Sequence, residues 1–129
     1  MKTNARVISL IVPYPPSVNH YWRAWRGRVC VSAEGRRYAA ALTIAAAKAG
    51  LRGLRLEGAL AVRCEFYPPD RRRRDLDNVA KALYDALTRA GIWGDDSQVA
   101  DAHFIRREAD KARPRVELTI SIISGGENG

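Results

Sequence analysis

The chain has 129 residues, 47% of them hydrophobic, which fits one compact domain with an ordinary core. The chain has 22 Lys and Arg against 14 Asp and Glu, so its net charge is +8, and most of the basic residues are arginine. This charge favours an anionic partner, and nucleic acid is a better candidate than a membrane or an acidic protein. The two cysteines, Cys30 and Cys64, form no CxxC motif, which argues against a zinc site and predicts reduced thiols that are buried or half-buried.

The N-terminal part predicts a strand followed by an aromatic and basic segment. Residues 6–12 are dominated by Val, Ile and Leu, and Pro13 ends the run. The run is too short to cross a membrane and has no signal-peptide cleavage region, so we expect a cytoplasmic protein without a membrane partner. Residues 17–28 predict a loop or loose hairpin with a turn at Arg26-Gly27. Their aromatic rings could stack on exposed bases, or pack in the core or at a dimer interface.

A long helix and a half-buried strand are predicted next. Ser32 is a typical N-cap, and the alanine-rich residues after it predict a helix through Lys48 that Gly50 stops. Residues 56–67 alternate in part between apolar and polar side chains, which is typical of a strand with one buried face. Pro68-Pro69 ends that strand.

The second half of the chain predicts one more helix and two more strands. Apolar residues recur at helical spacing over 76–90, and residues 98–107 and 115–123 predict strands. Residues 124–129 predict a disordered tail. The predicted fold class is α/β, more narrowly α+β: a mixed β-sheet packed by two helices in a single compact domain of residues 1–123.

The charged segment 70–78, DRRRRDLDN, joins the half-buried strand to the second helix. Arginine forks bind phosphate oxygens through paired hydrogen bonds, whereas lysine acts as a point charge. We therefore predict that four consecutive arginines bind DNA: Arg71, Arg72, Arg73 and Arg74. The solvated charged loop that is common in basic proteins is the alternative. We assign Asp70 no role beyond the turn after Pro69.

Carboxylates lie on both sides of the second helix and are candidate ligands for Mg²⁺. Asp75 and Asp77 stand at its start, and Asp95-Asp96 follows its end. A helix of about fifteen residues is roughly 22 Å long, and the linker 92–94 spans about 10 Å at most. Either the chain folds back or a dimer partner supplies the second acidic group, and the short linker favours the partner. A shorter or bent helix is a further alternative. Taken singly, each aspartate also suits a helix cap or a turn.

Lys81 lies one helical turn after Asp77, on the same face of the predicted helix. The spacing fits an exposed ion pair worth about 0.3–0.5 kcal/mol. It fits equally well a cation that stabilises the negative charge developing on a scissile phosphate. The sequence leaves these two interpretations open.

The chain resembles the RusA-type Holliday junction resolvases over nearly its whole length. The similar segments occur in the same order: PPSVNHYWR (15–23), VSAEGRRY (31–38), PPDRRRRDLDNVAKALYDAL (68–87), AGIWGDDSQV (90–99) and RVELTI (115–120). The combination of DRRRRDLDN with a following WxDD element is the most specific part of the resemblance.

The resemblance implies a small homodimeric endonuclease that requires Mg²⁺, for which Mn²⁺ can substitute. Such an enzyme resolves four-way DNA junctions by paired symmetric nicks, in DNA recombination and repair. By resemblance, the catalytic and metal-binding carboxylates fall on Asp75, Asp77 and Asp96, and the catalytic lysine falls on Lys81. Asp95 matches an adjacent acidic position, and Arg74 with its neighbours matches the basic stretch that faces DNA.

Two other nucleic-acid functions compete with junction cleavage, and a third alternative is a structural or regulatory partner protein, which would show no nucleic-acid affinity at moderate salt. A basic module could bind branched nucleic acid without cutting it, in which case the arginines would be functional and the aspartates only structural. A nuclease could instead prefer flaps or stem-loops. Cleavage assays on junction, duplex, flap and single strand separate these possibilities.

Overall fold

The structure is a computed structural model that describes residues 7–123, so the tail predicted at 124–129 lies outside the described residues. Along the chain, the elements are β1 (Val7–Pro13), α1 (Val18–Tyr21), β2 (Trp22–Trp25), β3 (Arg28–Val31), α2 (Ala33–Lys48), β4 (Leu60–Tyr67), α3 (Leu76–Arg89), the 3-10 turn η1 (Asp96–Gln98), β5 (Val99–Arg106) and β6 (Arg115–Ile122). The predicted count of two helices is wrong by one, because the four-residue α1 is too short to show a helical pattern.

A four-stranded sheet forms the centre of the fold, in the order β1-β6-β4-β5. Strand β4 pairs antiparallel with β6 and parallel with β5, so the predicted mixed sheet is confirmed. Alternation along β4 buries one face as predicted, although the regular strand begins at Leu60 rather than at residue 56. Pro13 pairs with Arg115 as the last residue of β1, a place that proline tolerates because β1 lies at the sheet edge.

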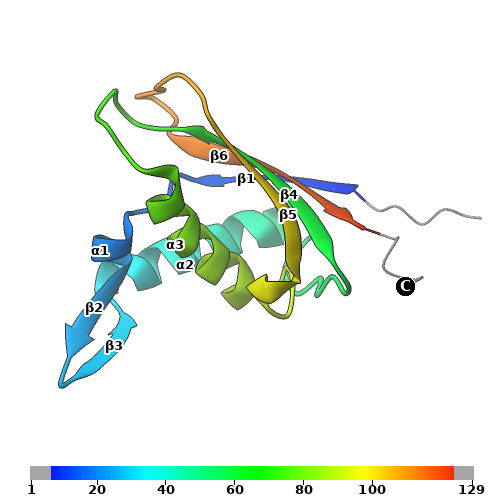
Figure 1. Cartoon of the computed structure of the whole chain (residues 1–129), viewed down its shortest axis with the longest axis horizontal. Helices are drawn as coiled ribbons and strands as arrows, with labels where there is room; N and C mark the ends of the chain where they lie inside the picture. The colour runs from blue at the N-terminus through cyan, green and yellow to red at the C-terminus, as the bar shows by residue number, and fades with distance from the viewer. Residues whose placement is uncertain (1–6, 124–129) are drawn as a thin grey trace, which may run out of the picture.

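Local signals start and stop the two long helices as predicted. The Ser32 hydroxyl accepts the N–H of Gly35 at 2.9 Å at the start of α2, and Gly50, with a φ of +75°, follows its end. Helices α2 and α3 lie on the same side of the sheet (Figure 1). The face of α3 turned to the core is rich in small and branched apolar side chains: Val79, Ala80, Ala82, Leu83, Ala86 and Leu87.

The aromatic and basic segment forms a hairpin, β2–β3, that projects from the body of the molecule (Figure 1). Arg26 and Gly27 have φ values of 53° and 72°, as a two-residue hairpin turn with both central residues in the left-handed region requires. The predicted loose hairpin is therefore confirmed and is regular over all four residue pairs.

The two cysteines differ in their surroundings. Cys64 is fully buried in β4, as predicted, and burial raises the pKa of its thiol to about 12. Cys30 is exposed on β3, which corrects the prediction of a buried or half-buried thiol. The difference arises because β3 belongs to the projecting hairpin and not to the central sheet.

No helix among residues 7–123 is long and apolar enough to span a membrane.

Candidate active site

The N-terminus of α3 presents the first carboxylates of the candidate site. Asp75 is its N-cap, and its Oδ1 accepts the N–H of Asp77 at 3.1 Å. Residues four apart share one face of a helix, so Asp77, Lys81 and Asp85 form one stripe. The side chains of Asp77 and Lys81 are exposed, whereas Asp85 is half-buried.

The chain folds back as soon as α3 ends. Gly91 takes a φ of +77°, and Trp93 pairs with Leu56 in an isolated bridge. Asp95 then caps η1 in a capping box with Gln98, and β5 returns alongside β4. This return brings Asp96 back beside the helix that precedes it.

Asp77, Lys81 and Asp96 line one open pocket of a single chain. The rest of its lining consists of Trp22, Ala80, Tyr84, Asp85 and Phe104. No partner chain is therefore needed to bring Asp77 and Asp96 to the same pocket, contrary to what the short linker favoured. Asp75 lines the adjoining pocket, which shares Asp77 and Phe104 with the first.

The acidic side chains of the pocket differ in their pairing. Asp85 Oδ2 accepts hydrogen bonds from the Tyr21 hydroxyl at 2.5 Å and from Arg89 Nε at 2.6 Å, so its charge is balanced. Burial, followed by the hydrogen bond to Asp85, raises the pKa of Tyr21 well above its usual range. Among the described residues, Asp77 and Asp96 have no ion pair and no side-chain hydrogen bond, although the protein is rich in arginine.

The residues present fit a Mg²⁺ ion that is only partly held by protein. Within residues 7–123 no three acidic, histidine or cysteine side chains come together as a preformed cage. Mg²⁺ commonly keeps several waters and binds one or two carboxylates together with substrate phosphate. Unpaired Asp77 and Asp96 on one pocket, with Asp75 next to them, are hard oxygen donors of this kind.

The four predicted DNA-binding arginines are not equivalent. Arg74 Nη1 donates to Asp70 Oδ1 at 2.7 Å, and its guanidinium lies 5.8 Å from the ring centroid of Tyr14. Its side chain is only 20% exposed, so Arg74 holds the loop in place. Hydrogen bonds from Arg74 and then from the backbone of Arg72 lower the pKa of Asp70 to about 2. Asp70 thus anchors the arginine segment, a role that the sequence analysis missed.

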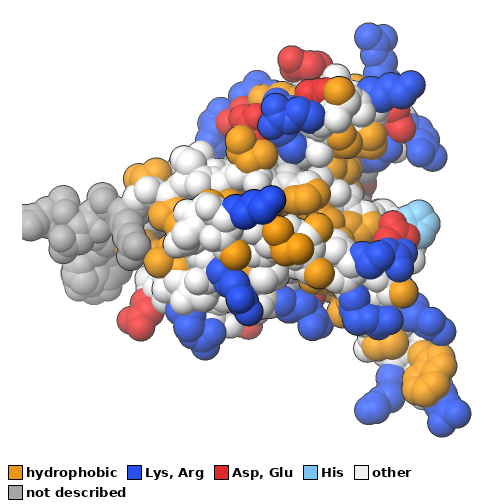
Figure 2. Space-filling model, turned by 180° about the vertical axis from the view of Figure 1, so that it is seen from behind, with side chains coloured by type: hydrophobic (Ala, Val, Ile, Leu, Met, Phe, Trp, Pro, Cys, Tyr) orange, Lys and Arg blue, Asp and Glu red, His pale blue; other side chains and the backbone are white. Residues whose placement is uncertain are grey.

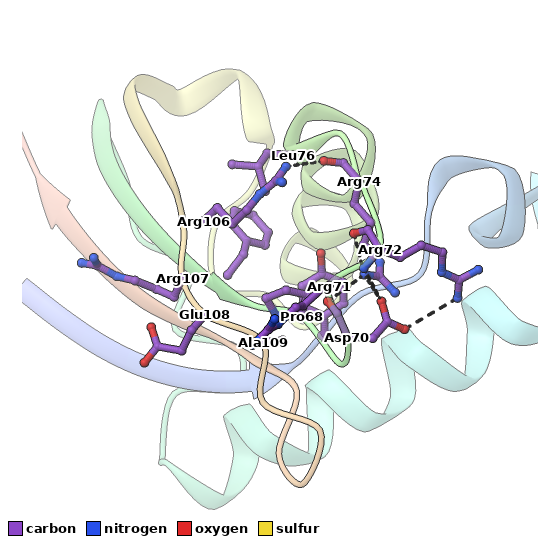
Figure 3. Close-up of a pocket in the computed structure, with 12 residues that line it drawn as sticks. Pro68, Asp70, Arg71, Arg72, Arg74, Leu76, Arg106, Arg107, Glu108 and Ala109 are labelled. Atoms are coloured by element: carbon purple, nitrogen blue, oxygen red, sulfur yellow. Dashed lines mark hydrogen bonds and ion pairs between the residues drawn. The ribbon is translucent and has the colours of Figure 1, made fainter.

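Arg71, Arg72 and Arg73 are exposed, and the structure adds Arg106 to them. Arg106 comes from the end of β5, lines both pockets around the arginine segment and donates to the carbonyl oxygen of Arg74. Figure 3 shows Arg106 and the arginine segment around one pocket, although they lie far apart in the sequence, with the Arg72 side chain turned towards Asp70. Only the parallel pairing of β4 and β5 brings Arg106 there, and no local sequence signal predicts that pairing.

Aromatic side chains wall the pocket that holds Asp77 and Asp96. Tyr84 packs edge-to-face against Trp93 and Phe104, with ring centroids 5.4 and 6.1 Å apart. Trp22 forms another side of the pocket, at the root of the hairpin β2–β3. Aromatic residues of these types are expected in the core or in stacking contacts, but nothing in the sequence predicts that these side chains line the pocket of Asp77 and Asp96.

Comparison with known proteins places these features in one family. The family model described as "Endodeoxyribonuclease RusA" matches residues 13–121. The chain is 46% identical over 113 residues to the "Crossover junction endodeoxyribonuclease RusA" of Escherichia coli (strain K12) and to that of Shigella sonnei (strain Ss046), covering 88% of this chain and 92% of each relative. The protein of that name from Enterobacteria phage 82 is 44% identical over 112 residues, covering 87% of this chain and 92% of the relative.

Proposed function

This chain belongs to the RusA endodeoxyribonuclease family, and we propose that it is a metal-dependent endonuclease that resolves four-way DNA junctions, in recombination and repair. The observation that carries the proposal is the pocket on which unpaired Asp77 and Asp96 meet Lys81. The adjoining pocket of Arg73, Arg74 and Arg106, and the further pocket that shares Arg74 and Arg106 with it, would supply a surface for the DNA backbone next to these carboxylates.

We assign Mg²⁺, or Mn²⁺ in its place, to Asp77 and Asp96, with Asp75 as a further ligand. Such an ion activates water and offsets charge on a phosphoryl group when it is bound. Asp75 also caps α3, so its Oδ1 is held towards the backbone of Asp77 while its second oxygen makes no hydrogen bond among the described residues.

Lys81 would supply a positive charge at the same pocket. Its ammonium group would stabilise the negative charge that develops on the phosphate oxygens during cleavage. Arg71, Arg72, Arg73 and Arg106 would hold neighbouring phosphates through hydrogen bonds to their guanidinium groups. Arg74 would act indirectly, by keeping the segment folded onto Asp70.

A homodimer is the assembly that suits a four-way junction, since a twofold protein places two equal sites on two equivalent strands. Each chain would carry a complete Asp77–Asp96 pocket, so the partner would be needed to pair the nicks and not to build the site. Sedimentation should then give a particle of twice the 14.3 kDa chain mass.

The first test is cleavage of a synthetic four-way junction. We expect paired nicks in Mg²⁺ or Mn²⁺, no nicks in EDTA, and recovery of cleavage when Mg²⁺ is added back. Gel-shift binding to the same junction should persist in EDTA, because the arginines bind phosphate without the ion. Binding without nicks in Mg²⁺ would favour a non-cleaving module, and faster cutting of flaps, duplex or single strand would assign another substrate.

The exposed arginines should be visible in the salt dependence of binding. Each phosphate contact contributes about 0.9 to the slope of log affinity against log salt concentration. We expect Arg73→Gln to weaken junction binding and to reduce this slope by about one contact. Arg113→Gln is the matched control, because that exposed arginine lies in the loop before β6 and lines none of the pockets around Asp77. Equal slopes for the Arg73 variant and the wild type would exclude Arg73 from the DNA contact.

A further inference from the structure

The hairpin β2–β3 projects from the body of the described chain, and only Trp22 at its root lines the pocket of Asp77 (Figure 1). Trp25 at its tip is 52% exposed, and Val29 is 75% exposed. Figure 2 shows hydrophobic side chains on this projection with Lys and Arg side chains around them. Large exposed apolar side chains on a protruding element are typical of a contact surface.

The strand register divides the hairpin into two faces. Residues directly opposite each other in an antiparallel pair share a face, and successive residues alternate. One face is apolar and consists of Trp22, Ala24, Val29 and Val31. The other is basic and aromatic and consists of Arg23, Trp25, Arg28 and Cys30. The guanidinium of Arg26 lies over the Trp25 ring, 4.6 Å from its centroid, and adds a third arginine to the hairpin.

The charge of the hairpin favours an anionic partner over a second copy of this basic chain. Residues 17–33 hold three arginines and no Asp or Glu. An indole beside arginines is also the arrangement with which proteins hold unpaired nucleic acid, because bases stack on the ring and phosphates pair with the guanidinium groups.

The root of the hairpin is fixed directly to the wall of the candidate active site. Tyr21 is fully buried, accepts the N–H of Ser32 at its carbonyl and packs on Trp22 with ring centroids 4.4 Å apart. A Cβ at Gly35 would lie 2.3 Å from that carbonyl oxygen, so glycine is required for α2 to approach so closely. Trp22 itself lines the pocket of Asp77.

We propose that the hairpin β2–β3 is a branch-reading arm that stacks Trp25 on a base exposed at the crossover point of the junction. The proposal rests on the proposed function. Strand geometry puts Trp25 about 10 Å beyond Trp22, within the width of one DNA helix from the pocket. Bases inside a duplex have both faces covered by their neighbours, whereas a branch point leaves base faces open. The stacking contact would therefore favour junctions over linear duplex.

The test compares Trp25→Ala with Trp25→Phe, which keeps a stacking ring, by equilibrium binding in EDTA to a four-way junction and to linear duplex. Loss of base–aromatic stacking should weaken junction binding of the Trp25→Ala protein by about 5- to 150-fold and leave duplex binding within twofold. Trp25→Phe should retain most of the junction affinity. A 2-aminopurine placed at the branch point should be quenched by the wild type and not by Trp25→Ala.

The outcomes distinguish failure of the proposed arm from failure of the proposed nuclease function. Wild-type nicking with equal junction affinity and equal quenching for Trp25→Ala would overturn the arm and leave the proposed function standing. Absence of junction nicking by the wild type would overturn the proposed function itself. A change of sedimentation in Trp25→Ala with unchanged quenching would show that the arm joins two copies of the chain and would overturn the proposal. Quenching by the wild-type protein does not depend on any variant folding.

Discussion

Replacing Asp77 by Asn is expected to lower the rate of junction cleavage by about 100-fold or more while leaving junction affinity nearly unchanged. The substitution keeps the size and shape of the side chain but removes its negative charge. That charge is what makes the carboxylate a good ligand for a divalent cation. A 100-fold loss corresponds to about 3 kcal/mol of transition-state stabilisation. Asp77 is exposed and its side chain makes no hydrogen bond among the described residues, so the fold has no need of the carboxylate.

Asp95 and Asp96 provide a matched control for this prediction. Asp96 lines the pocket and Asp95 does not. The Asp95 side chain instead accepts the N–H of Ser97 at 2.9 Å as the N-cap of η1, a role that asparagine fills equally well. Single-turnover cleavage should be nearly lost in Asp77→Asn and Asp96→Asn and close to wild type in Asp95→Asn. Wild-type rates in the Asp77 variant, or equal losses in the two neighbours, would contradict the assignment of the ligands.

The features of the helices that the sequence predicts correctly are those that local chemistry determines. Ser32 and Asp75 cap their helices because a short oxygen-bearing side chain can accept the exposed N–H groups of a first turn. The face of α3 that carries Asp77 and Lys81 follows from helical periodicity alone. These contacts span only a few residues, so their signals are complete within a short window of sequence.

The sequence analysis assigned Asp96 to the site, but the way in which Asp96 reaches the pocket and the presence of Arg106 depend on contacts between distant segments. Asp96 reaches the pocket of Asp77 because the chain reverses after Gly91, Trp93 forms a bridge to Leu56, and β5 then pairs parallel to β4. Arg106 reaches the arginine segment through the same pairing. The length of linker 92–94 gives the reach of the chain and not its direction, and this is why the sequence pointed to a partner subunit.

The anchoring of Arg74 by Asp70 shows a different limit of prediction from the sequence. Four consecutive arginines look alike in sequence, but Asp70 lies four residues before Arg74, and the turn between them brings the two side chains to 2.7 Å. One arginine is thereby withdrawn from the solvent. The sequence predicts that the four arginines bind phosphate, but the local fold decides which of them remain free to do so.

Trp93 connects the stability of the fold to the position of Asp96, and we expect Trp93→Ala to affect both. The side chain is fully buried, its Nε1–H donates to Thr88 Oγ1 at 2.6 Å, and its ring packs on Tyr84. Truncating a buried aromatic residue to alanine typically costs about 3–5 kcal/mol. Domains of this kind have total stabilities of about 5–15 kcal/mol, so the variant should unfold at a much lower urea concentration.

Trp93→Phe separates the two effects of this residue. Phenylalanine keeps most of the ring and loses the indole N–H, and Thr88 still donates its hydroxyl proton to the carbonyl of Tyr84, so we expect a loss of only about 1–2 kcal/mol. Cleavage per folded molecule should stay near wild type in Trp93→Phe. It should fall well below the folded fraction in Trp93→Ala, because the turn that carries Asp96 loses the ring against which it is fixed. Cleavage that simply follows the folded fraction in both variants would show that the position of Asp96 does not depend on Trp93.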